Sequence, residues 1–331
     1  MGIVKDILYK MSDLKYLKSV NKQSVFPYYH IVSNETVPHI KYLYSYKNIQ
    51  HFESDIKLLS KNYISPTINN VIEKNVKENT FLFTFDDGLS EVYSTIYPIL
   101  KENKLPAVFF INPDYVDNLK MMYKHRLSVL LSFLEKVNFD KKTLDEIAEI
   151  CQFEYQDVDS FKEKFLKLKF VQEKEIDRVF ELLGIDERKY LVENRLYITK
   201  AQIREMMDDG FYFGGHSMSH RPLNELNYEE QKKEIIDSVQ WLKDNFGISY
   251  SLFAFPFSDK EISAKLIKEL FEYDPNIILF GNSGIKKDID SRIIQRFSLE
   301  NPTKDTAKVL VRENLYKYYN KLIGKYKIKR H

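Results

Sequence analysis

The stretch FLFTFDDGLSEVYSTIYPILKENKLPAVFFIN, from Phe81 to Asn112, decides the fold of this 331-residue chain. An apolar, aromatic run at 80–85 is typical of a buried strand, and a second such run follows at 106–112. Between them, residues 90–104 carry apolar side chains at helical spacing. A strand, a helix and a strand in so few residues predict a βαβ unit with parallel strands.

The same alternation of short apolar runs and helical patterns extends over most of the chain. Further helices are expected at 48–63, 199–210 and 227–247, and Ser258 with Glu261 predicts a capping box at the start of another. Further strands are expected at 25–32, 211–215, 251–257, 276–281 and 292–297. Seven mostly parallel strands with helices between them favour an α/β fold of the distorted (β/α)7 barrel type over an open sheet.

The alternation of strand and helix patterns stops between about Asp117 and about Arg195, where the sequence is charged and contains no strand pattern. A structureless loop of this length is implausible in a compact protein. We expect four helices there, at 125–137, 142–153, 161–170 and 171–185. The predicted organisation is a barrel domain of residues 1–116 and 196–331, interrupted by a helical insertion at 117–195.

Composition limits the class of protein. Lys plus Arg number 50 against 48 for Asp plus Glu, so no affinity for nucleic acid is expected. No run is long and apolar enough for a transmembrane segment, and the first 20 residues lack the apolar region of a signal peptide, so we expect a cytoplasmic protein. The basic, aromatic tail YKYYNKLIGKYKIKRH (316–331) is expected to be a solvated terminal helix that frays. Its alternative is a membrane-peripheral role, in contact with an anionic bilayer or a lipid-linked glycan.

Two histidines in GGHSMSH, His216 and His220, directly follow the predicted strand at 211–215. A spacing of four places both rings on one side of a helical turn. We expect Gly214 and Gly215 to let ligands approach closely. Such a pair is a weak signal alone, but two imidazoles and one carboxylate form the open ligand set of a catalytic zinc-type site.

The acid comes from Asp86 and Asp87, which follow the strand at 80–85. In a parallel barrel the carboxyl ends of the strands share one face, so these side chains and the histidines are expected to meet. One carboxylate would bind the metal and its neighbour would accept a proton. Gly88 allows the backbone turn that aims both inward. The alternative, acids that complement a helix dipole, is favoured only if the histidines are ignored.

TFDDG (84–88) together with HSMSH (216–220) resembles the polysaccharide deacetylase family, also known as carbohydrate esterase family 4 or the NodB-homology domain. The similarity runs from about Val25 to Glu300, apart from the helical insertion. The resemblance implies a distorted barrel, one divalent metal ion, usually zinc, and removal of N-acetyl groups from sugars. It also assigns a general base, Asp86, and three metal ligands: Asp87, His216 and His220.

The resemblance extends to FAFPF (253–257), which looks like the family motif that lines the groove, with Phe255, Pro256 and Phe257 as substrate-binding residues. The arginine usual in that motif is missing, and Arg296 is the candidate to supply its charge. A backbone N–H near Asn112 is expected to stabilise the oxyanion.

The family's late histidine, which serves as general acid, is also missing from RIIQRFSLE (292–300). Some members have a permuted arrangement with an early histidine at a strand end, and PYYHIV (27–32) resembles that segment. His30 is therefore the candidate general acid, and its alternative is a satisfied core histidine. Two other histidines are expected to lie outside the site: His39 in an exposed loop and His125 at a polar helix start. The alternative for each is a contact with the substrate.

We therefore expect a metal-dependent hydrolase that acts on an acetylated amino sugar or glycan, lipid-linked forms included. The helical insertion (117–195) would roof the site and restrict it to small or terminal sugars. Two alternatives remain open: a non-catalytic glycan-binding homologue that has kept the fold, and an O-acetyl esterase or cyclic-amide hydrolase that uses the same site.

Overall fold

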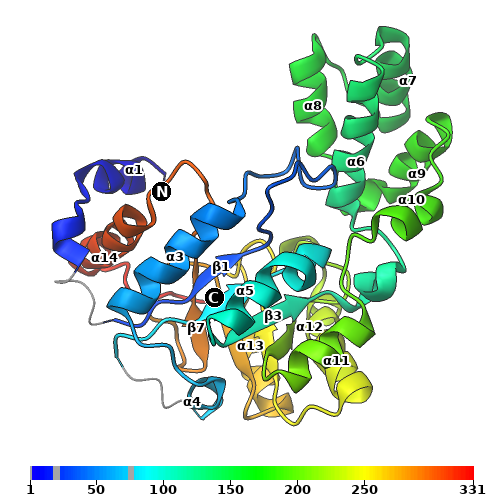
Figure 1. The fold of residues 1–331 in the computed structure, drawn as a ribbon. Helices are drawn as coiled ribbons and strands as arrows, with labels where there is room; N and C mark the ends of the chain where they lie inside the picture. Colours follow the sequence, from blue (N-terminus) through cyan, green and yellow to red (C-terminus); the bar gives the residue numbers. More distant parts are fainter. Residues whose placement is uncertain (1, 18–22, 74–77) are drawn as a thin grey trace.

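The computed structural model describes residues 2–17, 23–73 and 78–331. Eight parallel strands form a nearly closed, distorted barrel with helices around it (Figure 1). The barrel fold is confirmed, with one strand more than the seven predicted. The strands follow one another in the order β7-β6-β5-β4-β3-β2-β1-β8. They are β1 (Pro27–Tyr29), β2 (Phe83–Phe85), β3 (Ala107–Ile111), β4 (Tyr212–Gly215), β5 (Leu252–Ala254), β6 (Ile278–Gly281), β7 (Ile293–Gln295) and β8 (Phe297–Ser298).

The barrel closes at a single residue. The sequence predicts one strand at 292–297, but the chain breaks there into β7, which pairs with β6, and β8, which pairs with β1. Arg296 is the residue between them, and its N–H donates to the carbonyl of Gly281 at 3.1 Å. The two ends of the sheet are thus joined by the backbone of Arg296, and a bend at this point lets one segment pair with strands on both sides.

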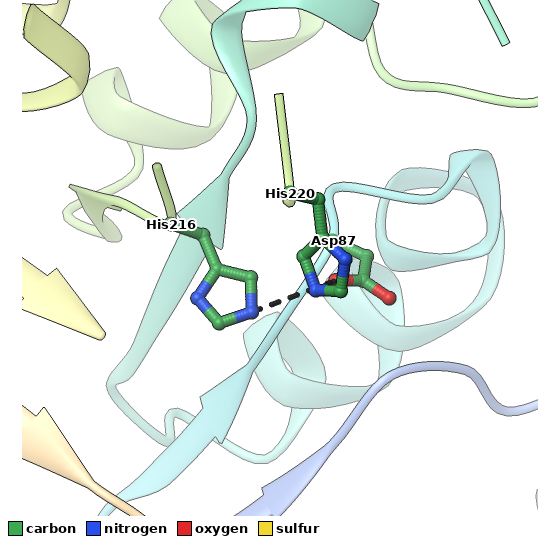
Figure 2. A group of neighbouring side chains, drawn as sticks. All are labelled: Asp87, His216 and His220. Atoms are coloured by element: carbon green, nitrogen blue, oxygen red, sulfur yellow. Dashed lines mark ion pairs between the residues drawn. The ribbon is translucent and has the colours of Figure 1, made fainter. Parts of the chain in front are cut away.

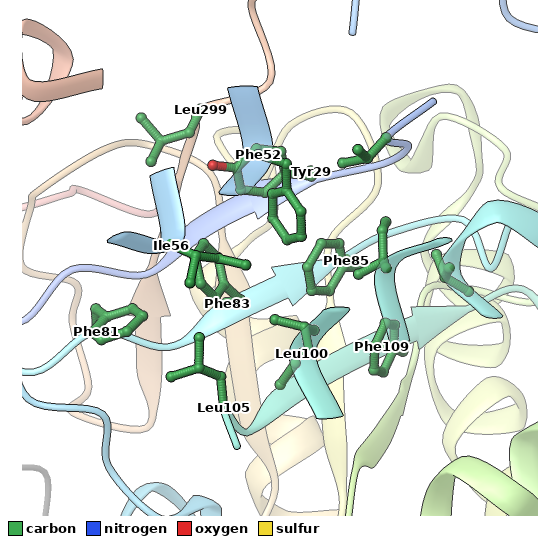
Figure 3. Close-up of a cluster of buried hydrophobic side chains, with 14 of the residues drawn as sticks. Tyr29, Phe52, Ile56, Phe81, Phe83, Phe85, Leu100, Leu105, Phe109 and Leu299 are labelled. Atoms are coloured by element: carbon green, nitrogen blue, oxygen red, sulfur yellow. The ribbon is translucent and has the colours of Figure 1, made fainter. Parts of the chain in front are cut away.

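An aromatic ladder on the outer face of the barrel fixes the register. Tyr29 lies opposite Phe85, Phe85 opposite Phe109, and Phe109 opposite Phe213. The rings of Phe85 and Phe109 stack with centroids 5.1 Å apart, and those of Phe109 and Phe213 are 5.5 Å apart. Figure 3 shows this layer packed with Phe52 of the covering helix α3 (Ile49–Asn62). Because the register is set by these rings, the residue after each strand falls at the same edge of the sheet.

Strand β2 is buried on both faces, as parallel strands in α/β proteins are. Phe83 and Phe85 belong to the outer cluster with the helices. Leu82 belongs to an inner cluster that includes Phe110, and the hydroxyl of Thr84 accepts a hydrogen bond from the buried Arg296 at 3.0 Å. The near-continuous apolar run at 80–85 therefore reflects burial from both sides, with one polar side chain inside the barrel.

Helices cover the outside of the barrel and lie near the predicted ranges. The helix expected at 90–104 begins as a turn of π-helix, η2 (Val92–Ile96), and continues as α5 (Tyr97–Glu102). The other α-helices of the described ranges outside 117–195, apart from α3, are α1 (Gly2–Met11), α4 (Ile68–Ile72), α11 (Lys200–Asp208), α12 (Tyr228–Phe246), α13 (Ala264–Tyr273) and α14 (Thr306–Leu322). Every helix within the described ranges is too short or too polar to traverse a bilayer.

The predicted capping box at Ser258 and Glu261 is wrong. Helix α13 begins later, with Ser263 as N-cap, whose hydroxyl accepts the N–H of Leu266 at 3.1 Å. The segment before it is held elsewhere, because Asp259 is fully buried and bonded to other parts of the chain. A helix starting at 261 would pull that carboxylate away from its partners.

Residues 123–194 are helical, with α6 (Tyr123–Lys136), α7 (Lys141–Cys151), α8 (Val158–Leu166), α9 (Glu173–Leu182) and α10 (Glu187–Asn194). Four of these helices were expected. The fifth, α10, is polar on nearly all sides and buries only Leu191, so its sequence carries little helical periodicity. A separate apolar cluster around Leu127, Phe161 and Ile176 holds these helices together, and they project from the barrel in Figure 1. The division into a barrel domain and a helical insertion stays a prediction.

The C-terminal tail is docked, and the expectation that it frays is wrong. Arg330 pairs with Asp259 at 2.7 Å and with Asp288 at 2.6 Å, and all three side chains are completely buried. Lys327 also forms a parallel bridge with Lys287. Two buried carboxylates require a counter-charge, and Arg330 provides it from the end of the chain.

Replacing Arg330 with methionine is expected to lower the free energy of unfolding by about 3–5 kcal/mol, because it leaves the buried carboxylates of Asp259 and Asp288 without a counter-charge. Urea denaturation monitored by circular dichroism measures the change. Lys329→Met, at an exposed neighbouring position, is the matched control and should have little effect. A loss for Arg330→Met below about 1 kcal/mol, the size expected of an exposed ion pair, would contradict this account of the tail.

Candidate active site

Side chains from four strand ends meet at the carboxyl-terminal face of the barrel. Asp86 and Asp87 follow β2, His30 follows β1, and His216 follows β4. Arg296 enters from the break between β7 and β8. Because Tyr29 and Phe85 are paired in register, His30 and Asp86 leave their strands at the same level. This is the face on which the chemistry of parallel barrels is assembled.

Asp87, His216 and His220 form a compact buried cluster (Figure 2). Oδ1 of Asp87 lies 3.2 Å from Nε2 of His220 and 3.6 Å from Nε2 of His216. One ligand atom from each residue lies within 4.8 Å of the others. Oδ1 of Asp87 is buried yet accepts no hydrogen bond from any residue in the described ranges. A buried carboxylate oxygen facing two imidazole nitrogens, with no hydrogen-bond donor, is the arrangement expected around a cation.

The turn after β2 aims the carboxylate of Asp87 at the histidines. Asp87 itself has φ +73°, and Gly88 has φ +64°. A Cβ at position 88 would lie 2.9 Å from Cγ2 of Ile111. Position 88 therefore favours glycine for two reasons: the backbone has a positive φ, and a side chain would contact Ile111 too closely. The positive φ of Asp87 is a strained conformation for a residue with a side chain, and such strain concentrates at functional sites.

The two histidines do not lie on a helical turn, so the geometric reason given for their spacing is wrong. Residues 216–220 form a loop in which Ser217 has φ +63° and His220 has φ +50°. A residue just after β3 stabilises this loop: the side-chain amide of Asn112 donates to the carbonyls of His216 and Ser217. The hydroxyl of Ser217 accepts the N–H of His220 at 3.0 Å. Left-handed residues and these bonds, not helical periodicity, bring the rings together.

The glycines before His216 serve packing. A Cβ at Gly214 would lie 2.6 Å from the ring of Phe110, and one at Gly215 would lie 2.3 Å from Oγ of Ser238 in α12. The close approach predicted at these positions therefore involves neighbouring side chains and not a ligand. A substitution at either glycine would push β4 away from its neighbours.

Protonation in the cluster suits a divalent cation. His216 donates its Nδ1–H to the carbonyl of Ala254 at 2.8 Å, which leaves the Nε2 lone pair facing Asp87. Burial lowers the pKa of His216 to about 4, so the ring is neutral at neutral pH. Burial alone would raise the pKa of Asp87, but the charge of His220 holds it well below its usual value. An ionised carboxylate, as at Asp87, and a neutral imidazole with a free Nε2 lone pair, as at His216, are forms that bind metal, and the residues present fit zinc.

Asp86 is held by Arg296 in a two-pronged ion pair. Nη1 and Nη2 of Arg296 donate to the two carboxylate oxygens of Asp86 at 2.7 and 2.9 Å. Burial alone would raise the pKa of Asp86, but the guanidinium of Arg296 lowers it below its usual value. Oδ2 of Asp86 also lies 3.9 Å from Nε2 of His216, so the carboxylate borders the cluster. The guanidinium lies inside the barrel, 5.1 Å from the rings of both Tyr28 and Phe110.

His30 is paired with Glu300, a residue that the sequence analysis did not single out. Nδ1 of His30 lies 2.8 Å from Oε2 of Glu300, which also accepts the N–H of His30 at 3.1 Å. Burial alone would lower the pKa of His30, but the carboxylate of Glu300, helped by Asp87 and Asp86, raises it to about 10. Glu300 lies just past β8 (Phe297–Ser298). Its position near the end of a predicted strand is the sequence feature that could have identified it as a residue of the site.

A cleft of about 410 Å³ opens over these residues. Of the predicted substrate-binding residues, Phe255 and Phe257 line the cleft, whereas Pro256, Asn112 and Arg296 are not among its lining residues. The ring of Phe257 lies 4.6 Å from that of His220. The rest of the lining includes residues of the site and residues contributed by the 38–44 segment, α6 and α8: Tyr28, His30, Tyr42, Leu43, Tyr44, Asp86, Asp87, Met122, Lys124, His125, Leu166, His216, His220 and Asn282.

Two histidines expected away from the site lie deep in the structure. His125 lines the cleft and its Nδ1 lies 2.7 Å from the hydroxyl of Tyr197. Burial lowers the pKa of His125 to about 3, so it is neutral. His39 is 5% exposed, not in an exposed loop, and its ring meets that of His125 at 5.4 Å. These contacts join the 38–44 segment to α6, so the wall of the cleft is built from two distant parts of the chain.

Comparison with known proteins gives one family. The sequence matches the family model described as polysaccharide deacetylase over residues 73–147 and 165–275, more than half of the chain. No curated protein sequence matches it significantly.

Several solved structures share the fold. The Streptococcus pyogenes deacetylase PplD, in complex with acetate, is 13% identical with a TM-score of 0.54, covering 89% of this chain and 97% of its own. IcaB from Ammonifex degensii is 15% identical with a TM-score of 0.52, covering 88% and 97%. BC0361, a polysaccharide deacetylase from Bacillus cereus, is 15% identical with a TM-score of 0.51, covering 88% and 69%.

Proposed function

This chain belongs to the polysaccharide deacetylase family, and we propose that it hydrolyses the N-acetyl group of an amino sugar or glycan with the help of one divalent metal ion, for which we propose zinc. The observation that carries the proposal is the convergence of Asp87, His216 and His220 around an unsatisfied carboxylate oxygen, next to the ion-paired Asp86. A non-catalytic glycan-binding protein would have no need for this buried arrangement of charges.

A divalent cation held by Asp87, His216 and His220 would polarise an acetyl carbonyl and acidify a water molecule. The chain's own residues provide the proton transfers. Asp86 would accept a proton from the attacking water at the carboxylate oxygen that faces His216. Arg296 keeps that carboxylate ionised and fixes its plane, while each oxygen retains a second lone pair for the proton.

His30 would donate the proton that the leaving amine needs. Its Nδ1 is engaged by Glu300, so Nε2 is the nitrogen available to the cleft. In the proposed reaction the C–N bond of the amide breaks, a C–O bond forms from water, and acetate and a free amine leave. Asp86 and His30 follow paired positions of neighbouring strands, so an amide bound between them would have the proposed base and the proposed acid within reach.

Replacing Glu300 with glutamine is expected to shift the alkaline limb of the pH profile of kcat downward. His30 must be protonated, so activity is present below its pKa and is lost as the pH rises through it. With Glu300 that loss lies near pH 10, whereas without the charge of Glu300 the burial of His30 is opposed only by Asp87 and Asp86, and its pKa falls. Glu300→Gln should therefore lose activity at a lower pH than wild type does.

The control for this experiment is Glu261→Gln, at an exposed position on the loop before α13, which should leave the profile unchanged. A Glu300→Gln profile that superimposes on that of wild type would rule out His30 as the general acid.

The proposed substrate is small or is the end of a glycan. The cleft of about 410 Å³ is near the lower end of ligand-pocket sizes. Tyr44, whose ring lies 4.9 Å from that of His30, and Met122, the residue before α6, line this cleft. Aromatic walls suit the apolar faces of sugar rings. Acetylated amino sugars carried on a lipid are included in this class.

The test is acetate release from a panel of N-acetylated amino sugars, O-acetylated sugars and cyclic amides. We expect acetate and a free amine from the first group. Binding without release would identify a glycan-binding homologue. Release confined to the second or third group would identify an esterase or a cyclic-amide hydrolase on the same residues.

A further inference from the structure

Exposed apolar side chains gather at one corner of the molecule, away from the cleft. Helix α1 (Gly2–Met11) exposes Ile3, Ile7 and Met11 to 79%, 53% and 66%. These residues are four positions apart, so they form a stripe along one side of the helix. The opposite side of α1 is occupied, because Lys5 pairs with Glu313 at 2.8 Å and the hydroxyl of Tyr9 accepts the N–H of Asp305.

The C-terminal end of α14 (Thr306–Leu322) continues this corner, since α1 packs on α14 (Figure 1). Leu322 is 87% exposed, and Ile323, Tyr318 and Tyr319 beside it are also exposed. Together with the stripe on α1 and Tyr16, these residues make up about half of the large exposed apolar side chains in the part of the chain that the structure describes. Single exposed apolar residues are normal on a protein surface, but a concentration in two adjoining helices marks an interaction site.

The unpaired charge at this corner is positive, because the two exposed acids of the N-terminal segment are paired: Asp6 lies 4.0 Å from Lys304 and Asp13 lies 3.4 Å from Lys15. No acidic residue follows Glu313 in the sequence, whereas residues 314–331 include five lysines. Within the described ranges, the following lysines take part in no ion pair: Lys10, Lys321, Lys325, Lys327 and Lys329. Lys321 lies over the rings of Tyr318 and Tyr326, which keeps its charge beside the apolar surface.

From this combination we propose that α1 and the end of α14 dock the protein on the surface of an anionic membrane. Aliphatic and tyrosine side chains would enter the boundary between headgroups and acyl chains, and the lysines would contact anionic headgroups. The buried Arg330 anchors the tail, so the lysines before it are presented from a fixed segment.

Two other binding partners match this surface less well than an anionic membrane does. A second copy of this chain, related by a twofold axis, would bring the unpaired lysines against their own equivalents. Nucleic acid would use the lysines but would leave the stripe of Ile3, Ile7 and Met11 in water. An anionic bilayer satisfies both the charge and the apolar surface.

The test is co-sedimentation of the full chain with phosphatidylcholine vesicles, with and without phosphatidylglycerol. We expect binding only to vesicles with phosphatidylglycerol, weakened by salt. Lys321→Glu with Lys325→Glu should reduce binding about tenfold or more. Ile7→Ser with Leu322→Ser should reduce it comparably at low salt. Both variants change exposed side chains, and unchanged thermal unfolding would show that they fold.

The matched control is Lys141→Glu with Lys142→Glu, which makes the same change of net charge on exposed lysines of α7. It should bind vesicles as wild type does. The proposal is overturned by any of three results: no binding to vesicles containing phosphatidylglycerol, an equal loss in the α7 control, or self-association without vesicles that Ile7→Ser with Leu322→Ser abolishes. Deacetylase activity plays no part in the test, so its outcome is independent of the proposed reaction.

Discussion

Asp86→Asn is expected to lower kcat by about 10²–10⁴-fold, the usual contribution of a positioned proton acceptor. Asparagine has nearly the same shape, so the substrate and the neighbouring Asp87 should keep their positions. What is lost is the basic oxygen beside the cluster, 3.9 Å from Nε2 of His216. The measurement is acetate release from the best substrate of the panel, with metal content determined on the same preparation.

Metal content is the control that separates this role from that of a ligand. Asp86→Asn should retain a full complement of metal. It should also be less stable, because Arg296 is left buried without an anion, so activity must be measured well below the unfolding temperature. Activity within tenfold of wild type in a folded, metal-loaded Asp86→Asn would show that another group accepts the proton.

Alanine at His220 is expected to abolish both metal binding and turnover. It removes one of three ligands, and a carboxylate with one imidazole is a poor set for zinc. Because the ring of His220 borders the cleft, the fold should tolerate its loss. Elemental analysis after dialysis gives the metal content, and acetate release gives the activity.

The matched control is His51→Ala, which removes an exposed histidine from α3. It should keep both metal and activity. A chelator should abolish the activity of wild type and of the control, and zinc should restore both. Full activity of His220→Ala after exhaustive chelation would exclude the proposed centre.

Much of the fold and the main side chains could be predicted because they follow local rules. The run at 80–85 is apolar on both faces, which is typical of a parallel strand, and parallel strands place their carboxyl ends together. That rule alone brings Asp87 to His216 across β3. The assignment of roles to these residues stays a prediction that the experiments above test.

The remaining features depend on contacts that no local pattern encodes. The strand at 292–297 is interrupted because it must pair with two neighbours, and only the closed barrel places Arg296 against Asp86. The histidine loop has left-handed residues, and the side chain of Asn112, which follows β3, stabilises it. The tail looked solvated because its lysines are exposed, while Arg330 among them pairs with acids 42 and 71 residues away.

The most direct test of the account is a crystal of the protein grown or soaked with zinc and measured at the zinc absorption edge. The account predicts one strong anomalous peak within coordination distance of Asp87, His216 and His220, with Asp86 beside the ion and not bound to it. An empty cluster at saturating zinc, or an ion held elsewhere while the two imidazoles hydrogen-bond to protein groups, would contradict it.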